Sequence, residues 1–304
     1  MTSGQARREL KERYLSSLPK ASGRRRLIDK LVTFTALGCV ILAMIPLGSI
    51  LIEVFTRGSP IISVEFLTEM PGSFIQGGGG LGPSIQGTLI VVGFASLVAV
   101  PLGILTGIYL SEFAGNGWFP STVRLLNDVL TGMPSIVIGL LAFLTVVLTT
   151  GTFSVGAGAF ALSIIMTPIV VRVTEESLKL VPNAVREAGH ALGVPKWKIS
   201  MMIILKSAKS GVLTGVVIGI ARIAGETAPL IMTILGARYF FDGFASPMDA
   251  LPLRIFKYGT SPYPEAQAAG WGGALILIIM ILTLSVALRF IVERKSGQFK
   301  SRNL

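Results

Sequence analysis

The chain has 304 residues, of which 51% are hydrophobic and only 14% are charged, and its mean hydropathy is +0.72. A typical soluble domain carries about 25% charged residues, so the composition excludes an ordinary soluble enzyme and indicates a protein embedded in a membrane. The net charge of +11 would suit nucleic-acid binding in a soluble domain. Here the basic residues gather in tails and loops, where membrane orientation explains them, and we expect no nucleic-acid partner.

Long uncharged stretches predict the membrane spans, because a helix crosses the bilayer core with roughly 20 apolar residues. Apart from Arg222 and Glu226, no charged residue interrupts the stretches 31–52, 70–111, 129–171, 210–237 and 266–288. The third of these is long enough for two spans. We therefore expect an all-α polytopic membrane protein with six transmembrane helices, at about residues 31–54, 86–110, 127–148, 154–173, 210–236 and 270–291.

The distribution of Lys and Arg predicts the orientation of these spans. The first 30 residues carry nine Lys or Arg residues, segment 174–209 carries six, and the tail after Arg289 carries four. The loop near 55–85 has only one, and the loop near 237–269 has three. Because loops rich in Lys and Arg are retained in the cytoplasm, we expect a multi-pass protein of the cytoplasmic membrane with both termini in the cytoplasm.

The residues that would support metal or nucleotide chemistry are scarce. Cys39 and His190 are the only cysteine and histidine in the sequence, so a Cys- or His-based metal centre is not expected. No Gly-x-x-x-x-Gly-Lys-Ser/Thr loop, which would cradle nucleotide phosphates, occurs in the chain. We expect no metal, no cofactor and no enzymatic activity, so any ATP hydrolysis that drives this protein must come from another chain.

The longest inner loop, at about 174–209, is predicted to contain a short helix. Asn183 follows Pro182 and is placed to cap a helix of about ten residues. Gly193-Val194-Pro195 provides the stop signal at its other end. Such a helix, exposed on the cytoplasmic face, is predicted to contact another protein.

The fifth span carries two charged residues. Arg222 and Glu226 are four residues apart and share one helix face. Arg222 lies about 20 Å along a helix that begins at Ser210, and a charge at that depth costs at least ~2.5 kcal/mol. Two interpretations stay open: an ion pair that offsets its own burial, or an arginine that meets an anion in transit, with Glu226 orienting the guanidinium or accepting a proton. The planar guanidinium suits phosphate or carboxylate.

Several motifs resemble one transporter family. The inner loop resembles the coupling loop of ABC-importer permeases at Glu187, Ala188, Gly193, Ile203 and Leu205, and departs from that pattern at Gly189 and Lys206. The run 221–230 is similar to the PstA-type membrane subunit of phosphate ABC importers. The stretches 132–139, 168–172 and 187–198 resemble the same family in the same order, and the resemblance covers roughly residues 85–292.

The resemblance implies roles for individual residues. It implies that the inner helix docks on an ATPase subunit through Ala184, Glu187, Ala188 and Gly193. It also implies a substrate path that includes Arg222, Glu226, Arg172, Thr227 and Ser135. Positive-inside bias alone also explains Arg172, and helix packing alone explains the two hydroxyl residues, so these alternatives stay open.

The resemblance further implies the fold and the assembly. It implies a type I ABC importer, or MetI-like, permease fold in a transmembrane domain at 31–292, with its core at 85–292, a basic cytoplasmic N-terminal tail at 1–30 and a cytoplasmic C-terminal tail at 293–304. The implied partners are a second, PstC-like permease chain, two PstB-like ATPase chains, a PstS-like extracytoplasmic phosphate-binding protein and membrane lipid. Phosphate is preferred over sulfate on the resemblance alone, since an arginine fork suits both.

Two rival functions are retained. One is a self-sufficient anion channel or secondary transporter, in which Arg222 and Glu226 relay ions without ATP. The other is a membrane enzyme acting on phosphorylated lipid, for which the sequence offers no convincing nucleophile and base.

Overall fold

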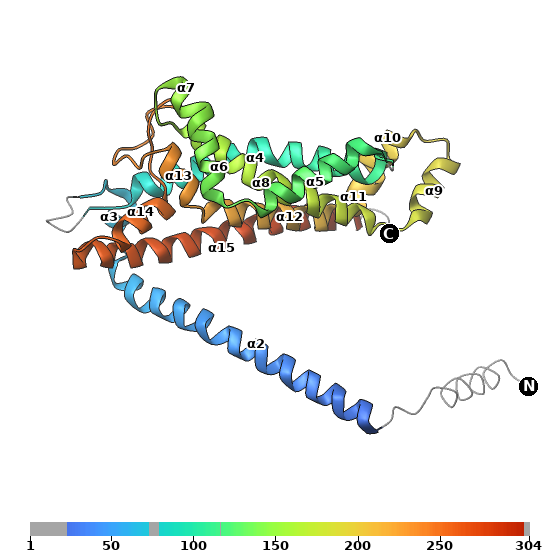
Figure 1. Ribbon diagram of the computed structural model, residues 1–304, viewed down its shortest axis with the longest axis horizontal. Helices are drawn as coiled ribbons and strands as arrows, with labels where there is room; N and C mark the ends of the chain where they lie inside the picture. The colour runs from blue at the N-terminus through green and yellow to red at the C-terminus, as the bar shows by residue number, and fades with distance from the viewer. Residues whose placement is uncertain (1–22, 73–78, 116, 301–304) are drawn as a thin grey trace, which may run out of the picture. The chain divides into compact units, whose positions relative to one another are not determined.

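A computed structural model describes residues 23–72, 79–115 and 117–300 of the chain (Figure 1). Most of the predicted N-terminal tail, and the last four residues of the predicted C-terminal tail, lie outside these ranges. The chain forms two compact units, Met1–Glu53 and Val54–Leu304.

The described residues are almost entirely helical. The helices are, in order, α2 (Gly23–Gly58), η1 (Ser59–Ile61), α3 (Val64–Thr68), α4 (Gly82–Ile108), η2 (Tyr109–Phe113), α5 (Trp118–Gly132), α6 (Ser135–Ala142), η3 (Phe143–Val147), α7 (Leu148–Thr150), α8 (Val155–Lys179), α9 (Asn183–Ala191), α10 (Lys196–Lys198), η4 (Ile199–Ile204), α11 (Leu205–Ser207), α12 (Lys209–Ala224), α13 (Ala228–Thr233), α14 (Leu251–Gly259) and α15 (Pro264–Lys300).

The described residues contain membrane-spanning helices of two kinds. Four are long and apolar enough to cross a bilayer unbroken: Leu27–Ile61, Gly82–Phe113, Val155–Lys179 and Pro264–Phe290. Two further helix pairs pass the same criterion only when taken together, and each is bent. The all-α membrane architecture is therefore confirmed, and the described part of the chain has six spans if each bent pair crosses once.

The third span is bent, which corrects the prediction of one helix at 127–148. Trp118–Gly132 and Ser135–Thr150 meet at an angle of 104°. Met133 has the extended dihedrals φ −71° and ψ 137°, as expected for a residue that precedes a proline, because the proline ring clashes with a helical conformation there. Pro134 then leads directly into α6.

The predicted inner loop at 174–209 is mostly helical, which is a second correction. α8 continues through Lys179, and the fifth span begins at Lys196 and bends by 73° near Ala208. The predicted short helix exists as α9, but its N-cap is Pro182. Asn183 therefore does not cap α9, and its side-chain oxygen accepts a hydrogen bond from Arg186 instead.

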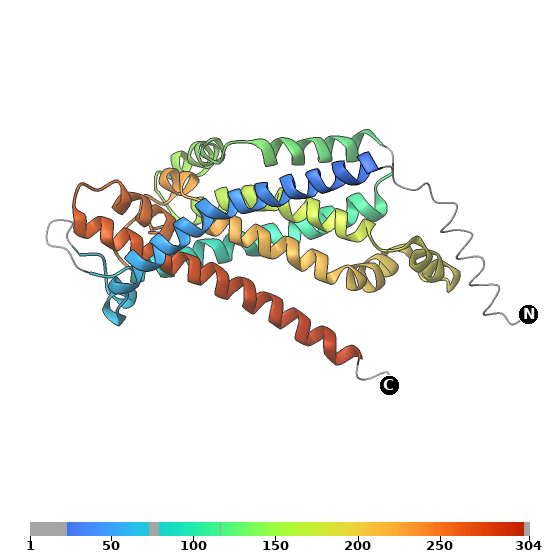
Figure 2. The same ribbon diagram turned by 90° about the horizontal axis from the view of Figure 1, so that it is seen from below.

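Helix α8 is the centre of the Val54–Leu304 unit and packs closely against α4 (Figures 1 and 2). Two glycines of α4, Gly103 and Gly107, make this approach possible. A Cβ atom at Gly103 would lie 2.7 Å from Cβ of Val170, and one at Gly107 would lie 2.7 Å from Cβ of Thr174. Small residues of this kind let helix backbones come together in membranes, where dispersion contacts drive association.

The other side of α8 packs against α12 in the same way. Three glycines spaced by four residues, Gly211, Gly215 and Gly219, face α8. A Cβ atom at Gly215 would lie 2.6 Å from Cβ of Val173, and one at Gly219 would lie 3.1 Å from Cγ of Met166. The three helices α4, α8 and α12 therefore form a closely packed group.

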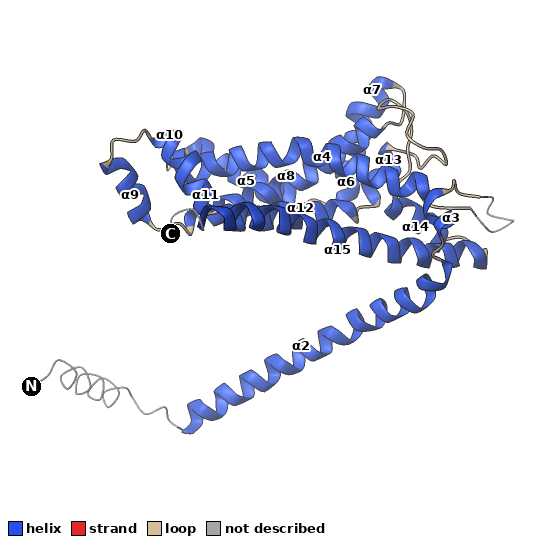
Figure 3. Cartoon of the chain, turned by 180° about the vertical axis from the view of Figure 1, so that it is seen from behind, coloured by secondary structure: helices blue, strands red, loops and turns tan. Residues whose placement is uncertain are grey.

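A buried ion pair organises the end of this unit that carries α3 and α14, opposite α9 (Figure 3). Arg254 Nε lies 2.6 Å from Asp249 Oδ2, and the two side chains are 2% and 0% exposed. Ser84 of α4 donates a hydrogen bond to the same carboxylate, and Thr88 Oγ1 accepts one from the Leu251 backbone at 2.8 Å. The loop before α14 is thereby fixed to α4, a link that the sequence did not reveal.

Candidate functional site

Arg222 lies in the last turn of α12, where the fifth span breaks. α12 ends at Ala224 and α13 begins at Ala228, so the segment predicted as the fifth span at 210–236 is interrupted before Pro229. Pro229 stands in the first turn of α13. Because proline has no backbone N–H and fixes φ, it starts a helix readily and interrupts one that would otherwise continue.

The break in the fifth span lies against the third span near its own break. A Cβ atom at Gly139 of α6 would lie 2.6 Å from Cα of Pro229. Met133, at the break between α5 and α6, packs against the apolar cluster that contains Ile223 and Ala224. Two interrupted helices therefore meet beside Arg222, an arrangement that recurs at the substrate sites of transporters.

The predicted pair of Arg222 and Glu226 is only loosely formed. Arg222 Nη2 lies 3.7 Å from Glu226 Oε1, which is too long for a hydrogen bond. The Arg222 side chain is 52% exposed and the Glu226 side chain 15% exposed. The guanidinium is therefore neither enclosed by this chain nor neutralised through short contacts with its own carboxylate.

Two predicted hydroxyl residues lie at the helix starts on either side of this meeting point. Thr227 is the N-cap of α13, and Ser135 is the first residue of α6. Both are partly buried. Neither side chain makes a hydrogen bond to any residue that the structure describes, so both hydroxyls have capacity to bind a ligand or water.

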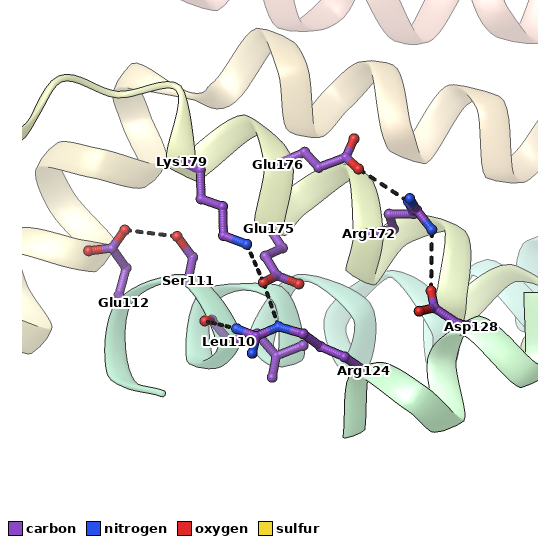
Figure 4. Close-up of polar contacts among 9 residues, drawn as sticks. All are labelled: Leu110, Ser111, Glu112, Arg124, Asp128, Arg172, Glu175, Glu176 and Lys179. Atoms are coloured by element: carbon purple, nitrogen blue, oxygen red, sulfur yellow. Dashed lines mark hydrogen bonds and ion pairs between the residues drawn. The ribbon is translucent and has the colours of Figure 1, made fainter. Parts of the chain in front are cut away.

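Arg172, the other predicted arginine, is held by two carboxylates (Figure 4). Its Nη1 lies 3.2 Å from Asp128 Oδ1, and its Nε lies 3.1 Å from Glu176 Oε1. The contact with Asp128 ties α8 to α5. These two carboxylates offset the charge of the guanidinium and occupy part of its donor fork.

Arg172 also lies at a different depth from Arg222. Its neighbour Val173 packs against Gly215 of α12, and Arg222 follows Gly215 by two helical turns, or roughly 10 Å. The structure therefore does not join the two arginines in one site, and a role for Arg172 in the path stays a prediction.

A second ion-pair group beside Arg172 was missed by the sequence analysis. Arg124 Nε lies 2.9 Å from Glu175 Oε1, and Lys179 Nζ lies 2.6 Å from the same oxygen (Figure 4). Arg124 also donates to the Leu110 carbonyl at 3.0 Å. The spacing of Glu175 and Lys179 by four residues could have indicated their pairing, but no local pattern links them to Arg124.

The predicted coupling residues lie together on the outer side of α9. Ala184, Glu187 and Ala188 are exposed, whereas Gly189 is buried against Ile199. Gly193 follows the helix with φ +71°, the left-handed conformation in which glycine commonly ends a helix. Helix α9 therefore has one side attached to the protein and one side free to contact a partner.

Comparison with known proteins identifies relatives along most of the chain. Residues 99–296 match the family model described as "Binding-protein-dependent transport system inner membrane component". The PstA phosphate transport system permease protein of Yersinia pestis is 38% identical over 281 residues, which is 92% of this chain and 95% of the relative. The probable PstA of Methanocaldococcus jannaschii is 37% identical over 270 residues, which is 88% of this chain and 95% of the relative.

Solved structures share the fold at much lower identity. A bacterial alginate ABC transporter chain superposes with a TM-score of 0.61 at 15% identity, covering 92% of this chain and 98% of that one. A MetNI methionine ABC transporter chain superposes with a TM-score of 0.56 at 18% identity, covering 72% of this chain and 94% of that one. The fold is thus that of ABC-importer permeases, as expected from the sequence. The chain belongs to the family of binding-protein-dependent transport system inner membrane components, together with the PstA permeases.

Proposed function

We propose that this chain is one membrane-spanning half of an ATP-driven importer of inorganic phosphate in the cytoplasmic membrane. The names and near-full coverage of the PstA relatives support phosphate as the substrate. The observation that carries the mechanism is the half-exposed Arg222, which lies near the helix breaks at Met133 and at Gly225–Thr227. Its planar donor fork would bind a phosphate oxygen pair, and an arginine in a membrane segment is tolerated where it lines a hydrated path.

The neighbours of Arg222 have complementary proposed roles. Glu226 would orient the guanidinium or take a proton from the phosphate, since the 3.7 Å gap leaves room for rearrangement. Thr227 and Ser135 would donate hydrogen bonds to the oxyanion. Arg172 is a second candidate in the path, although its two carboxylates hold it in a network between α5 and α8.

The proposed assembly places this chain among several partners. A second, PstC-like permease chain would complete the path in front of Arg222. Two PstB-like ATPase chains would bind the permeases, this one through Ala184, Glu187, Ala188 and Gly193 of the α9 region. A PstS-like protein would deliver phosphate to the outer face. Both termini would be cytoplasmic, as the Lys and Arg distribution requires.

The proposal predicts the effect of neutralising the central arginine. Arg222→Gln should abolish ATP-dependent phosphate uptake in proteoliposomes that contain the full complex, because the anion loses its charge-assisted hydrogen bonds. Arg222→Lys should retain part of the uptake, since it keeps the charge but loses the planar fork. Radioactive phosphate uptake measures both variants, and membrane insertion should equal that of the wild type.

A control variant and a test of the alternative function show which results would contradict the proposal. Arg289→Gln removes an exposed arginine in the C-terminal half of α15 and should leave uptake unchanged. Uptake at the wild-type rate by Arg222→Gln would contradict a role in the path. Phosphate flux through liposomes that contain this chain alone, without ATP, would instead favour the self-sufficient channel or secondary transporter.

A further inference from the structure

Helix α9 is attached to the membrane helices at few points. A cavity of about 410 Å³ lies beside it, lined by residues of η2, α9, α10 and η4. Val185 packs against the apolar cluster around Ile199, and Gly189 touches Ile199 directly. The cluster also contains Leu178 and Val181, so these apolar contacts connect α9 to the start of the fifth span and to the end of α8.

Among the described residues, α9 has one strong polar attachment to the membrane helices, a clamp that we define as Arg186 with Glu112. Arg186 Nη2 lies 2.8 Å from Glu112 Oε1, and Arg186 Nε lies 3.2 Å from Glu112 Oε2. Both oxygens of the carboxylate are thus bound in the forked geometry that gives arginine–carboxylate pairs their strength. The two side chains are 20% and 5% exposed, so the clamp is largely shielded from solvent.

Arg186 also binds the chain that leads into α9. Its Nη2 donates to the Leu178 carbonyl at 2.8 Å, and its Nη1 donates to the Val181 carbonyl at 2.5 Å. These carbonyls lie at the end of α8 and just beyond it, where the regular helical hydrogen bonds stop. Hydrogen bonding to Glu112 raises the pKa of Arg186 above its ordinary value, so the guanidinium stays charged. One guanidinium therefore joins α9, the end of α8 and the second span.

Glu112 belongs to an unusual part of the second span. It lies in η2, a π-helical stretch at Tyr109–Phe113 that follows the regular helix α4. Such stretches are rare and are frequent at functional positions. Since α4 packs on α8 through Gly103 and Gly107, a displacement of Glu112 acts on the central packed helices.

We propose that the Arg186–Glu112 clamp is the positioning element that transmits movement of α9 to the second membrane span. This inference rests on the proposed function and adds a specific route for coupling. An ATPase that moves α9 would pull η2 through the clamp, in addition to pushing the fifth span through Gly189 and Ile199. Without the clamp, ATP hydrolysis would continue while the second span no longer followed it.

The test uses the full complex reconstituted in proteoliposomes. Glu112→Gln should reduce the number of phosphate ions moved per ATP about tenfold, the change expected from losing one charge-assisted hydrogen bond. The amount of ATPase subunit that co-purifies should be unchanged, because α9 keeps its exposed face.

Arg186→Gln should reduce the ratio at least as much, because it also removes the bonds to the Leu178 and Val181 carbonyls. The double variant should be no worse than Arg186→Gln alone, since the contact with Glu112 is already lost in that variant.

The control is Lys196→Gln, which removes a cation from the same cavity without touching the clamp. It should leave the ratio of phosphate to ATP unchanged. If Arg186→Gln does not insert into the membrane, Arg186→Lys and Glu112→Gln carry the test. An unchanged ratio in Glu112→Gln would overturn the clamp proposal, and so would loss of the ATPase subunit from the complex. Wild-type complex that takes up no phosphate would instead overturn the proposed function.

Discussion

At the scale of single residues, two charged pairs have opposite environments. Arg222 and Glu226 lie 3.7 Å apart with the arginine half exposed, whereas Arg254 and Asp249 are in contact and fully buried. A buried pair in which one partner is removed leaves a charge that nothing compensates. The burial of Arg254 and Asp249 therefore predicts a role in stability, whereas the transport role of Arg222 and Glu226 stays a proposal.

The buried pair gives a stability prediction. Asp249→Ala should lower the free energy of unfolding by about 3–5 kcal/mol, because it leaves the Arg254 guanidinium buried without its carboxylate. Glu176→Ala is the matched control, since it breaks an exposed pair with Arg172 and should cost about 0–1 kcal/mol. Thermal unfolding in detergent compares the two variants. Equal melting temperatures would contradict the structural role of Asp249.

The sequence predicted some of these residues and not others. Arg222 was identifiable because a charge within an uncharged stretch is costly at that depth. The buried pair was not identifiable, because Asp249 depends on Ser84, which lies 165 positions away in the chain. The clamp likewise joins Glu112 to a residue 74 positions later, and no local periodicity reveals such a contact.

At the scale of helices, hydropathy located the spans but not their interruptions. A window of about 20 residues averages over a short break, so hydropathy did not show the bends near Met133 and Ala208. Proline alone does not identify a break either. Pro46, Pro101 and Pro168 lie inside helices, whereas Pro134 and Pro229 begin new ones. Packing against neighbouring helices decides between these outcomes.

The glycine contacts of α8 give a prediction at this scale. Gly215→Ala should destabilise the protein by about 1–3 kcal/mol, because its Cβ would lie 2.6 Å from Cβ of Val173 and force the helices apart. Gly93→Ala is the matched control in α4, where nothing lies within 4 Å of the added atom. Melting temperatures in detergent test the difference, and a Gly215→Ala variant as stable as Gly93→Ala would contradict the close packing.

At the scale of the whole molecule, the half-exposed side chain of Arg222 is compatible with the proposed assembly. In that proposal this chain would supply one wall of the path, and a second permease chain would supply the other. The family and fold expected from the sequence motifs are confirmed by relatives that cover about 90% of the chain. Orientation and partners stay predictions, because they depend on the membrane and on other chains.

The orientation leads to a labelling prediction. In a Cys39→Ala background, Leu192→Cys beside α9 should react with a membrane-impermeant maleimide only after cells are permeabilised. Phe244→Cys, in the loop before α14, should react in intact cells. Both wild-type side chains are exposed in this chain, at 81% and 50%, so neither site is buried within the protein itself. Labelling of Leu192→Cys in intact cells would reverse the predicted topology.

The glycine-mediated packing of α8 also determines where the protein deforms most easily. Interlocked backbones resist sliding, since any shift of α4 or α12 past α8 would force glycine surfaces against larger side chains. At Met133 and at Gly225–Thr227 the helices are interrupted, so no continuous ladder of helical hydrogen bonds stiffens the backbone there. In the proposed transport cycle, movement would therefore occur at those two joints, while α4, α8 and α12, which carries Arg222, would move as one block.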